Sequence, residues 1–213
     1  MKRILIIGSG DLGQQIAHYV SQSENYTIVG FVDDWVSVGE CRRGFPIIGC
    51  VSQIEELYKE NIFDELLIGI GYKHFDFRKS LFDKYKDIIP FATYIHPSCI
   101  VDKSAVIGRG SIILANCVIS MDANIGDNVF MYSGSVTGMC SKINSNTFIS
   151  ASVSTGGFSI IGEQCFVGLG SRIIDNIVLG DKNLLGAGSV LIKSYKENNS
   201  VLAGCPARLI RKQ

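Results

Sequence analysis

The sequence is poor in proline, histidine and charge. Its 213 residues include four prolines, three histidines and one tryptophan, and 19% of them are charged while 46% are hydrophobic. This mix excludes a wholly disordered chain, which requires high charge and few apolar residues. The longest apolar runs fall short of the ~18–20 residues of a membrane-spanning helix. We therefore expect a chain with a packed core and no membrane span.

Neither sign of charge prevails. Twenty Lys and Arg residues are balanced by twenty Asp and Glu residues, so the formal net charge is zero at pH 7. This balance removes the electrostatic argument for a protein that coats nucleic acid or an anionic membrane. The expected partner is a small molecule or another protein.

Paired cysteine motifs are also lacking. The seven cysteines are scattered, odd in number and never spaced as C-x-x-C. The sequence therefore predicts neither a disulfide framework nor a zinc ribbon. Reduced thiols of this kind are typical of a cytoplasmic protein, and we expect no metal site.

The first 94 residues alternate between strand-like and helix-like segments. The apolar, β-rich runs lie at 4–7, 26–32, 66–70 and 91–95. The helical patterns lie at 12–20, 52–59 and 75–86. Such alternation predicts a small α/β domain with a Rossmann-like parallel sheet.

A glycine-rich turn follows the first predicted strand and reads Gly8-Ser9-Gly10-Asp11-Leu12-Gly13. Glycines in this pattern permit a tight turn, and the free N–H groups at a helix start can hold a phosphate. Asp33 stands where a dinucleotide fold would place its ribose-binding acid, but 94 residues contain only the first mononucleotide-binding half. A nucleotide other than NAD is therefore favoured. The alternative is a glycine turn that merely packs a helix on a strand.

The remaining residues, 95–213, repeat with a period of six. Starting at Ile95 and stepping by six, fifteen of seventeen residues are aliphatic or Met, without an insertion or deletion. Small residues recur two positions earlier in each hexad, and glycine often recurs one position later. A triangular β-solenoid requires this pattern, with the aliphatic residue at the axis and glycine permitting the turn. The sequence thus predicts an all-β parallel β-helix of between five and six coils. The period alone is also compatible with an inert scaffold.

The chain as a whole resembles a known family. Its hexads are similar to those of left-handed β-helix acyltransferases. The motifs that carry a resemblance to the bacterial NeuD/PglD-like sugar acyltransferases are the glycine turn, Asp33-Asp34, Ile95-His96-Pro97-Ser98 and Gly204-Cys205-Pro206-Ala207-Arg208. The resemblance implies a homotrimer with acetyl-CoA between neighbouring β-helices, and a domain of residues 1–94 that binds a nucleotide-linked amino sugar. It also implies N-acetylation of an amino-dideoxy sugar for a bacterial surface glycan.

The resemblance assigns individual residues. Those expected to meet the sugar nucleotide are Gly8, Ser9, Gly10, Asp33, Asp34, Gly71, Tyr72 and Arg78. Those expected to meet CoA are Phe148, Gly157, Gly168, Ala187, Lys193 and Arg208. The last two belong to a basic stretch, 193–212, which could attract the CoA phosphates or form a solvated tail. Trp35 and Tyr72 could each stack on a base or cover the end of the sheet.

The chain departs from the family at the catalytic base. The family places a histidine and an acidic residue where the hexad register here gives Met139 and Cys140. Base catalysis is typically worth roughly 10²–10⁴-fold, so its absence slows an amine acyltransferase without forbidding it. Cys140 could instead act as base or acyl carrier, although only Lys142 could activate it. A catalytically silent, trimeric nucleotide-sugar-binding protein and a sugar O-acetyltransferase remain alternatives, and both residues could simply be apolar packing.

Overall fold

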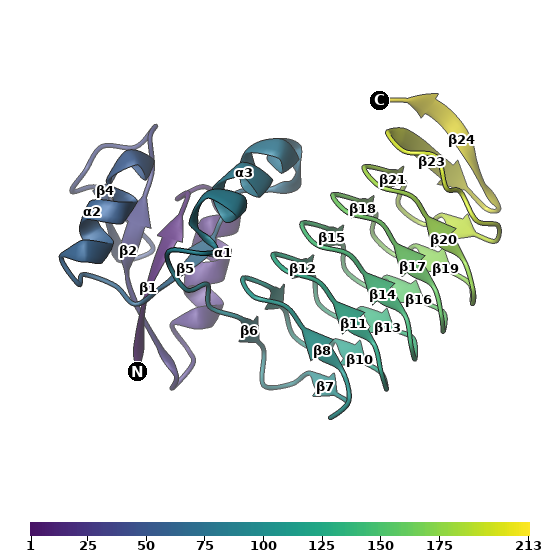
Figure 1. Ribbon diagram of the computed structural model, residues 1–213, viewed down its shortest axis with the longest axis horizontal. Helices are drawn as coiled ribbons and strands as arrows, with labels where there is room; N and C mark the ends of the chain where they lie inside the picture. Colours follow the sequence, from purple (N-terminus) through teal and green to yellow (C-terminus); the bar gives the residue numbers. More distant parts are fainter. The chain divides into compact units, whose positions relative to one another are not determined.

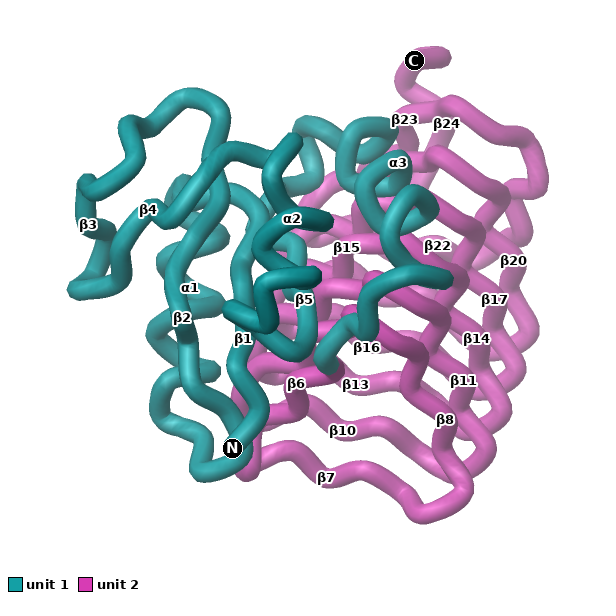
Figure 2. Tube along the Cα trace, turned by 60° about the vertical axis from the view of Figure 1, so that its left-hand side comes forward, with its two compact units in different colours: residues 1–92 teal, residues 93–213 magenta.

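The computed structural model describes all 213 residues, which form two compact units. The first unit comprises Met1–Ala92 and the second Thr93–Gln213 (Figure 2). The expected boundary, between residues 94 and 95, lies two residues later than this division. Each unit has its own architecture and is described separately.

The first unit is a five-stranded sheet with helices, in the order β3-β4-β2-β1-β5 (Figure 1). The strands are β1 (Lys2–Ile7), β2 (Tyr26–Val32), β3 (Cys41–Arg42), β4 (Phe45–Gly49) and β5 (Glu65–Ile68). The helices are α1 (Asp11–Val20), α2 (Ile54–Lys59) and α3 (Phe75–Tyr85), with short 3₁₀ turns η1 (Val51–Gln53) and η2 (Tyr72–His74). All pairs are parallel except β3 with β4. The Rossmann-like α/β class expected from the sequence is confirmed.

Two expectations for this unit are wrong in detail. The run 91–95 does not form a fourth strand of this sheet, because Phe91 makes a single bridge to Leu66 and the next strand belongs to the second unit. The β3–β4 hairpin was not expected, since proline and glycine interrupt its sequence. Its turn is formed by Arg43 and Gly44, with φ of 49° and 84°. Paired positive φ values of this kind match the twist of a two-residue hairpin.

The second unit is a parallel β-helix with three faces (Figure 1). The first face holds β7 (Ile100–Val101), β10 (Val118–Ile119), β13 (Val136–Thr137), β16 (Ser154–Thr155), β19 (Arg172–Ile173) and β22 (Val190–Leu191). The second holds β8 (Val106–Ile107), β11 (Asn124–Ile125), β14 (Lys142–Ile143), β17 (Ile160–Ile161) and β20 (Val178–Leu179). The third holds β6 (Tyr94–Ile95), β9 (Ile112–Ile113), β12 (Phe130–Met131), β15 (Phe148–Ile149), β18 (Phe166–Val167), β21 (Leu184–Leu185), β23 (Ser200–Gly204) and β24 (Ala207–Lys212).

The hexad period is confirmed as the packing period of this helix. Residues 18 apart pair in register, as Val118 does with Val136, so three hexads make one coil. The residues expected at the axis are buried from Ile113 to Leu191, whereas Ile95 in the first coil is 37% exposed. Successive strand residues point to opposite sides, so the neighbour of each axial residue faces away from the axis.

The recurrent glycines serve coil stacking rather than the turn itself. A Cβ on Gly138 would lie 2.5 Å from the carbonyl carbon of Gly156 in the next coil. Gly138 does not have positive φ; that conformation falls two residues later, at the third position after each axial residue. Non-glycine residues hold most of these positions, with φ between 54° and 62°: Asn116, Asp122, Asn128, Cys140, Asn146, Ser152, Phe158, Gln164, Asn176 and Lys182.

Candidate functional site

The first unit has a topological switch point between β1 and β5. After β1 the chain builds β2 and β4 on one side and then returns to place β5 on the other. In open parallel sheets, ligands bind outside the carboxyl ends of the strands at such a point. The turns Gly8–Gly10 and Gly69–Gly71 both emerge there, and the Gly69 N–H donates to the Ile7 carbonyl at 2.7 Å.

Ser9 and Asp33 join the glycine turn to the end of β2. Asp33 Oδ2 accepts hydrogen bonds from the backbone N–H and the hydroxyl of Ser9, both at 2.7 Å. Its Oδ1 accepts from the Trp35 N–H at 2.9 Å. Burial raises the pKa of Asp33, but the hydrogen bonds from Ser9, Trp35 and Val36 outweigh it, so the pKa lies below the usual 3.8. The carboxylate is therefore ionised and holds two loops together.

Asp34 makes a similar connection on the other side of the loop. Its Oδ1 accepts from the Val51 N–H at 2.9 Å, which ties the end of β2 to the start of η1. Trp35, the next residue, is 96% exposed, and Tyr72, after β5, is 40% exposed. The Trp35 ring therefore does not cover the end of the sheet, and that alternative is wrong for this residue. For Tyr72, which is partly buried, both alternatives stay predictions.

The glycines of the turn divide into packing and open positions. A Cβ on Gly13 would lie 2.0 Å from the Gly8 carbonyl oxygen, and one on Gly69 would lie 2.5 Å from the Gly13 Cα. These two glycines are needed for close packing of α1 against the strands. A Cβ on Gly10 or Gly71 would meet nothing within 4 Å. The packing alternative thus explains Gly13, while the surface at Gly10 and Gly71 is accessible to a ligand.

Arg78 is bonded to the backbone of the turn that follows β5. Its side chain is fully buried, and its guanidinium donates to the carbonyls of Ile68 at 2.8 Å and Ile70 at 3.1 Å. Burial lowers the pKa of Arg78 to about 9, so it is charged at pH 7. The residue holds the Gly69–Gly71 turn from beneath. Contact with the sugar nucleotide itself stays a prediction.

In the second unit, the expected acyl-transfer residues lie at a corner that we call the Met139 corner, comprising 120–122, 138–140, 156–158 and 174–176. Met139 is 41% exposed there. Cys140 has φ of 55°, and its N–H donates to the Met121 carbonyl in the preceding coil at 2.9 Å. No imidazole belongs to this corner, because the three histidines lie on α1, on η2 and after β6.

Gly157 lies one coil beyond Met139 and is bonded to an acid. Its N–H donates to Asp175 Oδ1 at 2.6 Å, and a Cβ on Gly157 would lie 3.2 Å from the Met139 Cγ. Asp175 is exposed. Our sequence reasoning missed this contact, although the 18-residue spacing of Met139, Gly157 and Asp175 could have revealed it.

The other residues expected to bind CoA do not gather at the same corner. Gly168 and Ala187 belong to the corner between the third and first faces, which we call the Ala187 corner: 114–116, 132–134, 150–152, 168–170 and 186–188. Gly168 is buried, and a Cβ there would lie 2.5 Å from the Ala187 N. Ala187 itself is exposed. Within one chain, the Met139 and Ala187 corners occupy opposite edges of the first face.

Phe148 is buried by neighbouring side chains rather than lying on an accessible surface. It is 1% exposed, and its ring stacks on Phe130 with centroids 5.5 Å apart and an interplanar angle of 17°. The expectation that Phe148 faces CoA is not supported by this burial. The hexad pattern identifies the inward residue of each strand but not what covers the outward one.

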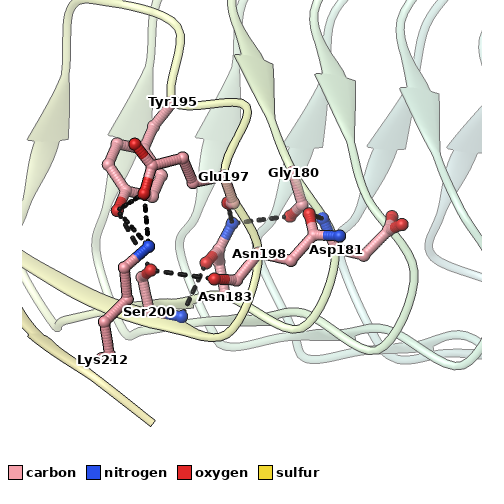
Figure 3. Close-up of polar contacts among 8 residues, drawn as sticks. All are labelled: Gly180, Asp181, Asn183, Tyr195, Glu197, Asn198, Ser200 and Lys212. Carbon is pink, nitrogen blue, oxygen red and sulfur yellow. Dashed lines mark hydrogen bonds and ion pairs between the residues drawn. The ribbon is translucent and has the colours of Figure 1, made fainter.

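The basic stretch 193–212 forms the end of the β-helix rather than a free tail. Figure 3 shows Lys212 directed at Glu197, its ion-pair partner, and at the Tyr195 hydroxyl, 3.4 Å away. Asn183 links this end to the preceding coil through the Glu197 carbonyl, at 2.7 Å. Lys193 and Arg208 are exposed and form no ion pair. Lys196 and Arg211 are likewise exposed and outside the Lys212–Glu197 ion pair, so each of these four cations can receive a phosphate.

Two further observations concern the whole chain. Nowhere do three or more His, Cys, Asp or Glu side chains gather as a metal site would require. None of the helices combines the length and the apolar character needed to cross a membrane.

Comparison with known proteins finds a family model that matches most of the first unit. Residues 3–85 match the PglD N-terminal domain. A UDP-N-acetylbacillosamine N-acetyltransferase from Bacillus subtilis is 33% identical over 122 residues, which are 54% of this chain and 52% of the relative. The match thus spans about half the length of the curated relative.

Solved structures share the complete fold. One is a histidine-to-asparagine variant of perosamine N-acetyltransferase from Caulobacter crescentus in complex with CoA and GDP-perosamine (TM-score 0.91, 24% identity, 100% of this chain and 98% of that chain). Another is the acetyltransferase domain of PglB from Neisseria gonorrhoeae with acetyl coenzyme A (TM-score 0.89, 24% identity, 98% and 99%). The β-helix fold expected for the second unit is therefore confirmed. The match of residues 3–85 to the PglD N-terminal domain supports the resemblance to that family.

Proposed function

We propose that this protein is an acetyl-CoA-dependent N-acetyltransferase that acts on a nucleotide-linked amino sugar in the synthesis of a bacterial surface glycan. The observation that carries the proposal is the combination of a PglD-type first unit, whose glycine turn lies at a switch point, with a β-helix. The Caulobacter enzyme of the same fold was solved with CoA and an amino-sugar nucleotide. The free thiols support a cytoplasmic location.

The residues at the switch point form the nucleotide-sugar subsite in this proposal. Gly10 and Gly71 leave open backbone for the ligand, and the N-terminus of α1 favours a phosphate. Ser9, Asp33, Asp34 and Arg78 hold the surrounding turns, so they act mainly through position. In the β-helix, Gly157 and Ala187 would line the path of CoA, and Lys193 and Arg208 would meet its phosphates.

The chemistry suits an amine better than a hydroxyl. The neutral amine nitrogen attacks the thioester carbonyl carbon, the C–N bond forms, the C–S bond breaks, and CoA departs as the thiol after taking up the proton that the nitrogen loses. A hydroxyl needs a base to become a comparable nucleophile, and the Met139 corner holds no imidazole. This absence favours N-acetylation over O-acetylation.

A homotrimer is part of the proposal. Exposed apolar side chains gather along the Met139 corner and just beyond it: Met121, Met139, Phe158, Ile174 and Ile192. Contiguous exposed apolar surface of this kind marks association sites. The Met139 and Ala187 corners also lie on opposite edges of one face, so a neighbouring copy is required to bring one corner against the other. CoA would then lie between two subunits.

One observation favours a second candidate, a catalytically silent nucleotide-sugar-binding protein. Met139 and Cys140 occupy the positions of the family's histidine and acid; the Met139 thioether is not a base, and the Cys140 thiol is not an efficient one without an activator. Such a protein would keep the switch-point subsite and lose transfer.

The deciding experiment is thiol release from acetyl-CoA with UDP-, dTDP- and GDP-linked 3-amino and 4-amino sugars, compared with the matching hydroxy sugars. N-acetyl transfer predicts free CoA with amino sugars only. Calorimetric binding of a sugar nucleotide without any thiol release would favour the silent protein. Release with hydroxy sugars alone would favour the O-acetyltransferase, and no binding of any sugar nucleotide would reject all three.

A further inference from the structure

Trp35 presents an exposed aromatic surface on a fixed backbone. It is the one tryptophan of the chain and is 96% exposed. Its N–H is bonded to Asp33, and the preceding Asp34 is bonded to the Val51 N–H. The exposure of the indole is therefore not the result of a loose loop. Large aromatic rings dominate burial and interface energies, so a fixed ring left in water is a candidate contact surface.

One carboxylate places this ring beside the glycine turn. Asp33 accepts from the Trp35 N–H through Oδ1 and from Ser9 through Oδ2. The Asp33 carboxylate thus bridges the backbone of Trp35 and the glycine turn, whose open N–H groups suit a phosphate. In a nucleotide one ribose separates the diphosphate from the base, so a diphosphate held at this turn would carry its base one ribose further on, and Trp35 follows Asp33 by two residues.

Asp33 is engaged at both oxygens. Oδ2 receives two donors from Ser9, and Oδ1 receives the N–H of Trp35. A bidentate contact of this carboxylate with the ribose hydroxyls would require breaking those bonds. The exposed Trp35 ring is another source of binding energy for a nucleoside at this edge of the sheet.

We propose that Trp35 is the platform on which the nucleobase of the sugar nucleotide stacks, with Asp33 as the residue that positions it. This inference rests on the proposed function, because it assigns a subsite to the same substrate. Every nucleobase has a π-face, so stacking tolerates different bases. The platform contributes affinity without reading the identity of the base.

The test uses calorimetry on the full chain with GDP- and UDP-linked sugars and with a sugar 1-phosphate, which has no base. Base–aromatic stacking of the usual strength predicts that Trp35→Ala weakens both nucleotides about ten-fold or more. Trp35→Phe should restore most of this loss. Affinity for the sugar 1-phosphate should be the same in both variants as in the wild type. Val38→Ala, at another exposed apolar residue of the same loop, is the matched control and should change nothing.

Intrinsic fluorescence provides a second readout, because Trp35 is the only indole. Stacking predicts that sugar nucleotides quench the Trp35 fluorescence saturably, with a midpoint that matches the Kd from calorimetry. The sugar 1-phosphate should leave the fluorescence unchanged. A purely structural role would not give base-dependent quenching.

Unchanged nucleotide affinity in Trp35→Ala, together with unchanged fluorescence, would overturn the inference. A second result would also overturn it: a wild-type emission spectrum that is blue-shifted without ligand and moves to longer wavelength on dilution. Such a spectrum would mean that a second copy of the chain covers the ring. If acetyl transfer persists in either case, the proposed function stands and the platform alone is rejected. If the wild type binds no sugar nucleotide, both are rejected.

Discussion

Ser9 and Asp33 are joined by two hydrogen bonds to a single carboxylate oxygen. The backbone N–H and the hydroxyl of Ser9 both donate to Asp33 Oδ2, and Ser9 is 2% exposed. Hydrogen bonds to an ionised acceptor are shorter and stronger than neutral ones. The shape of the glycine turn therefore depends on the charge of an acid that lies 24 residues away in the sequence.

Asp33→Asn should reduce stability at neutral pH and change its response to acid. The native pKa of Asp33 lies below 3.8, so its contribution is present above that pH and is lost as pH falls through the lowered native value. Urea unfolding at a series of pH values should show the wild-type advantage of about 1–3 kcal/mol near pH 7 shrinking as the pH falls below about 4. Glu24→Gln, on the exposed surface, is the control. An advantage that does not vary with pH would contradict the role assigned to the charge.

The sequence predicts most of the fold because two strong periodicities dominate it. Strand β2 has the expected limits, Tyr26–Val32, and the hexads identify the axial residues from Ile113 onward. The β3–β4 hairpin escapes prediction because Pro46 and two glycines interrupt its short segment, and because β4 is held in the sheet by pairing with the distant strand β2. Local pattern contains no information on such tertiary pairing.

The candidate site is less predictable for a related reason. A motif gives the position of a residue but not what its polar atoms already bind. Arg78 matches a family position, yet its guanidinium is used by two backbone carbonyls. Phe148 has the right register, yet it is buried against Phe130. The contact of Gly157 with Asp175 is a different case, because it follows from the 18-residue coil and was available from the sequence.

Gly138→Ala should destabilise the β-helix. The added Cβ would lie 2.5 Å from the Gly156 carbonyl carbon and 2.6 Å from the Gly157 N, where backbone cannot give way easily. Overpacking of this kind costs about 1–3 kcal/mol or more, measurable as a lower urea midpoint. Gly170→Asn is the contrasting variant, because Gly170 has φ of 68° and open space, like the corners that carry asparagine. It should fold with unchanged or slightly higher stability; equal losses in both variants would argue against the stacking role of Gly138.

Arg78→Met should weaken both folding and nucleotide binding. The change leaves the carbonyls of Ile68 and Ile70 without their donor, at a cost of about 1–3 kcal/mol for each group that stays buried. Loss of the desolvated charge offsets part of this cost. Lys79→Met, which removes an exposed ion pair with Asp83, should cost less than about 1 kcal/mol. The measurements are the free energy of unfolding and the calorimetric affinity for a sugar nucleotide in both variants. Unchanged binding in Arg78→Met would exclude a role of this residue in holding the turn.

Lys193→Ala and Arg208→Ala should each weaken CoA binding. Both side chains are exposed and not engaged in an ion pair, so each can approach a phosphate. Exposed charge pairs are worth up to about 1 kcal/mol, or roughly a five-fold change in Kd, and the effect should shrink at high salt. Lys212→Ala should leave CoA affinity unchanged because Glu197 already holds this cation. The reverse ranking in calorimetric titrations would show that the phosphates bind elsewhere.

Met139→His tests whether the missing imidazole limits the rate. Met139 is 41% exposed, so a histidine fits without disturbing the core. If acyl transfer occurs at this corner, the new base should raise kcat by up to about 10²-fold, because general base catalysis is typically worth 10²–10⁴-fold in an evolved site. The gain should appear as pH rises through about 6.5, where the imidazole becomes neutral, with KM for acetyl-CoA nearly unchanged.

Met121→His, one coil earlier in the same column, should give no gain. A gain in both variants would indicate a general effect of surface histidine, and none in either would mean that proton removal does not limit this enzyme or that transfer occurs away from this corner.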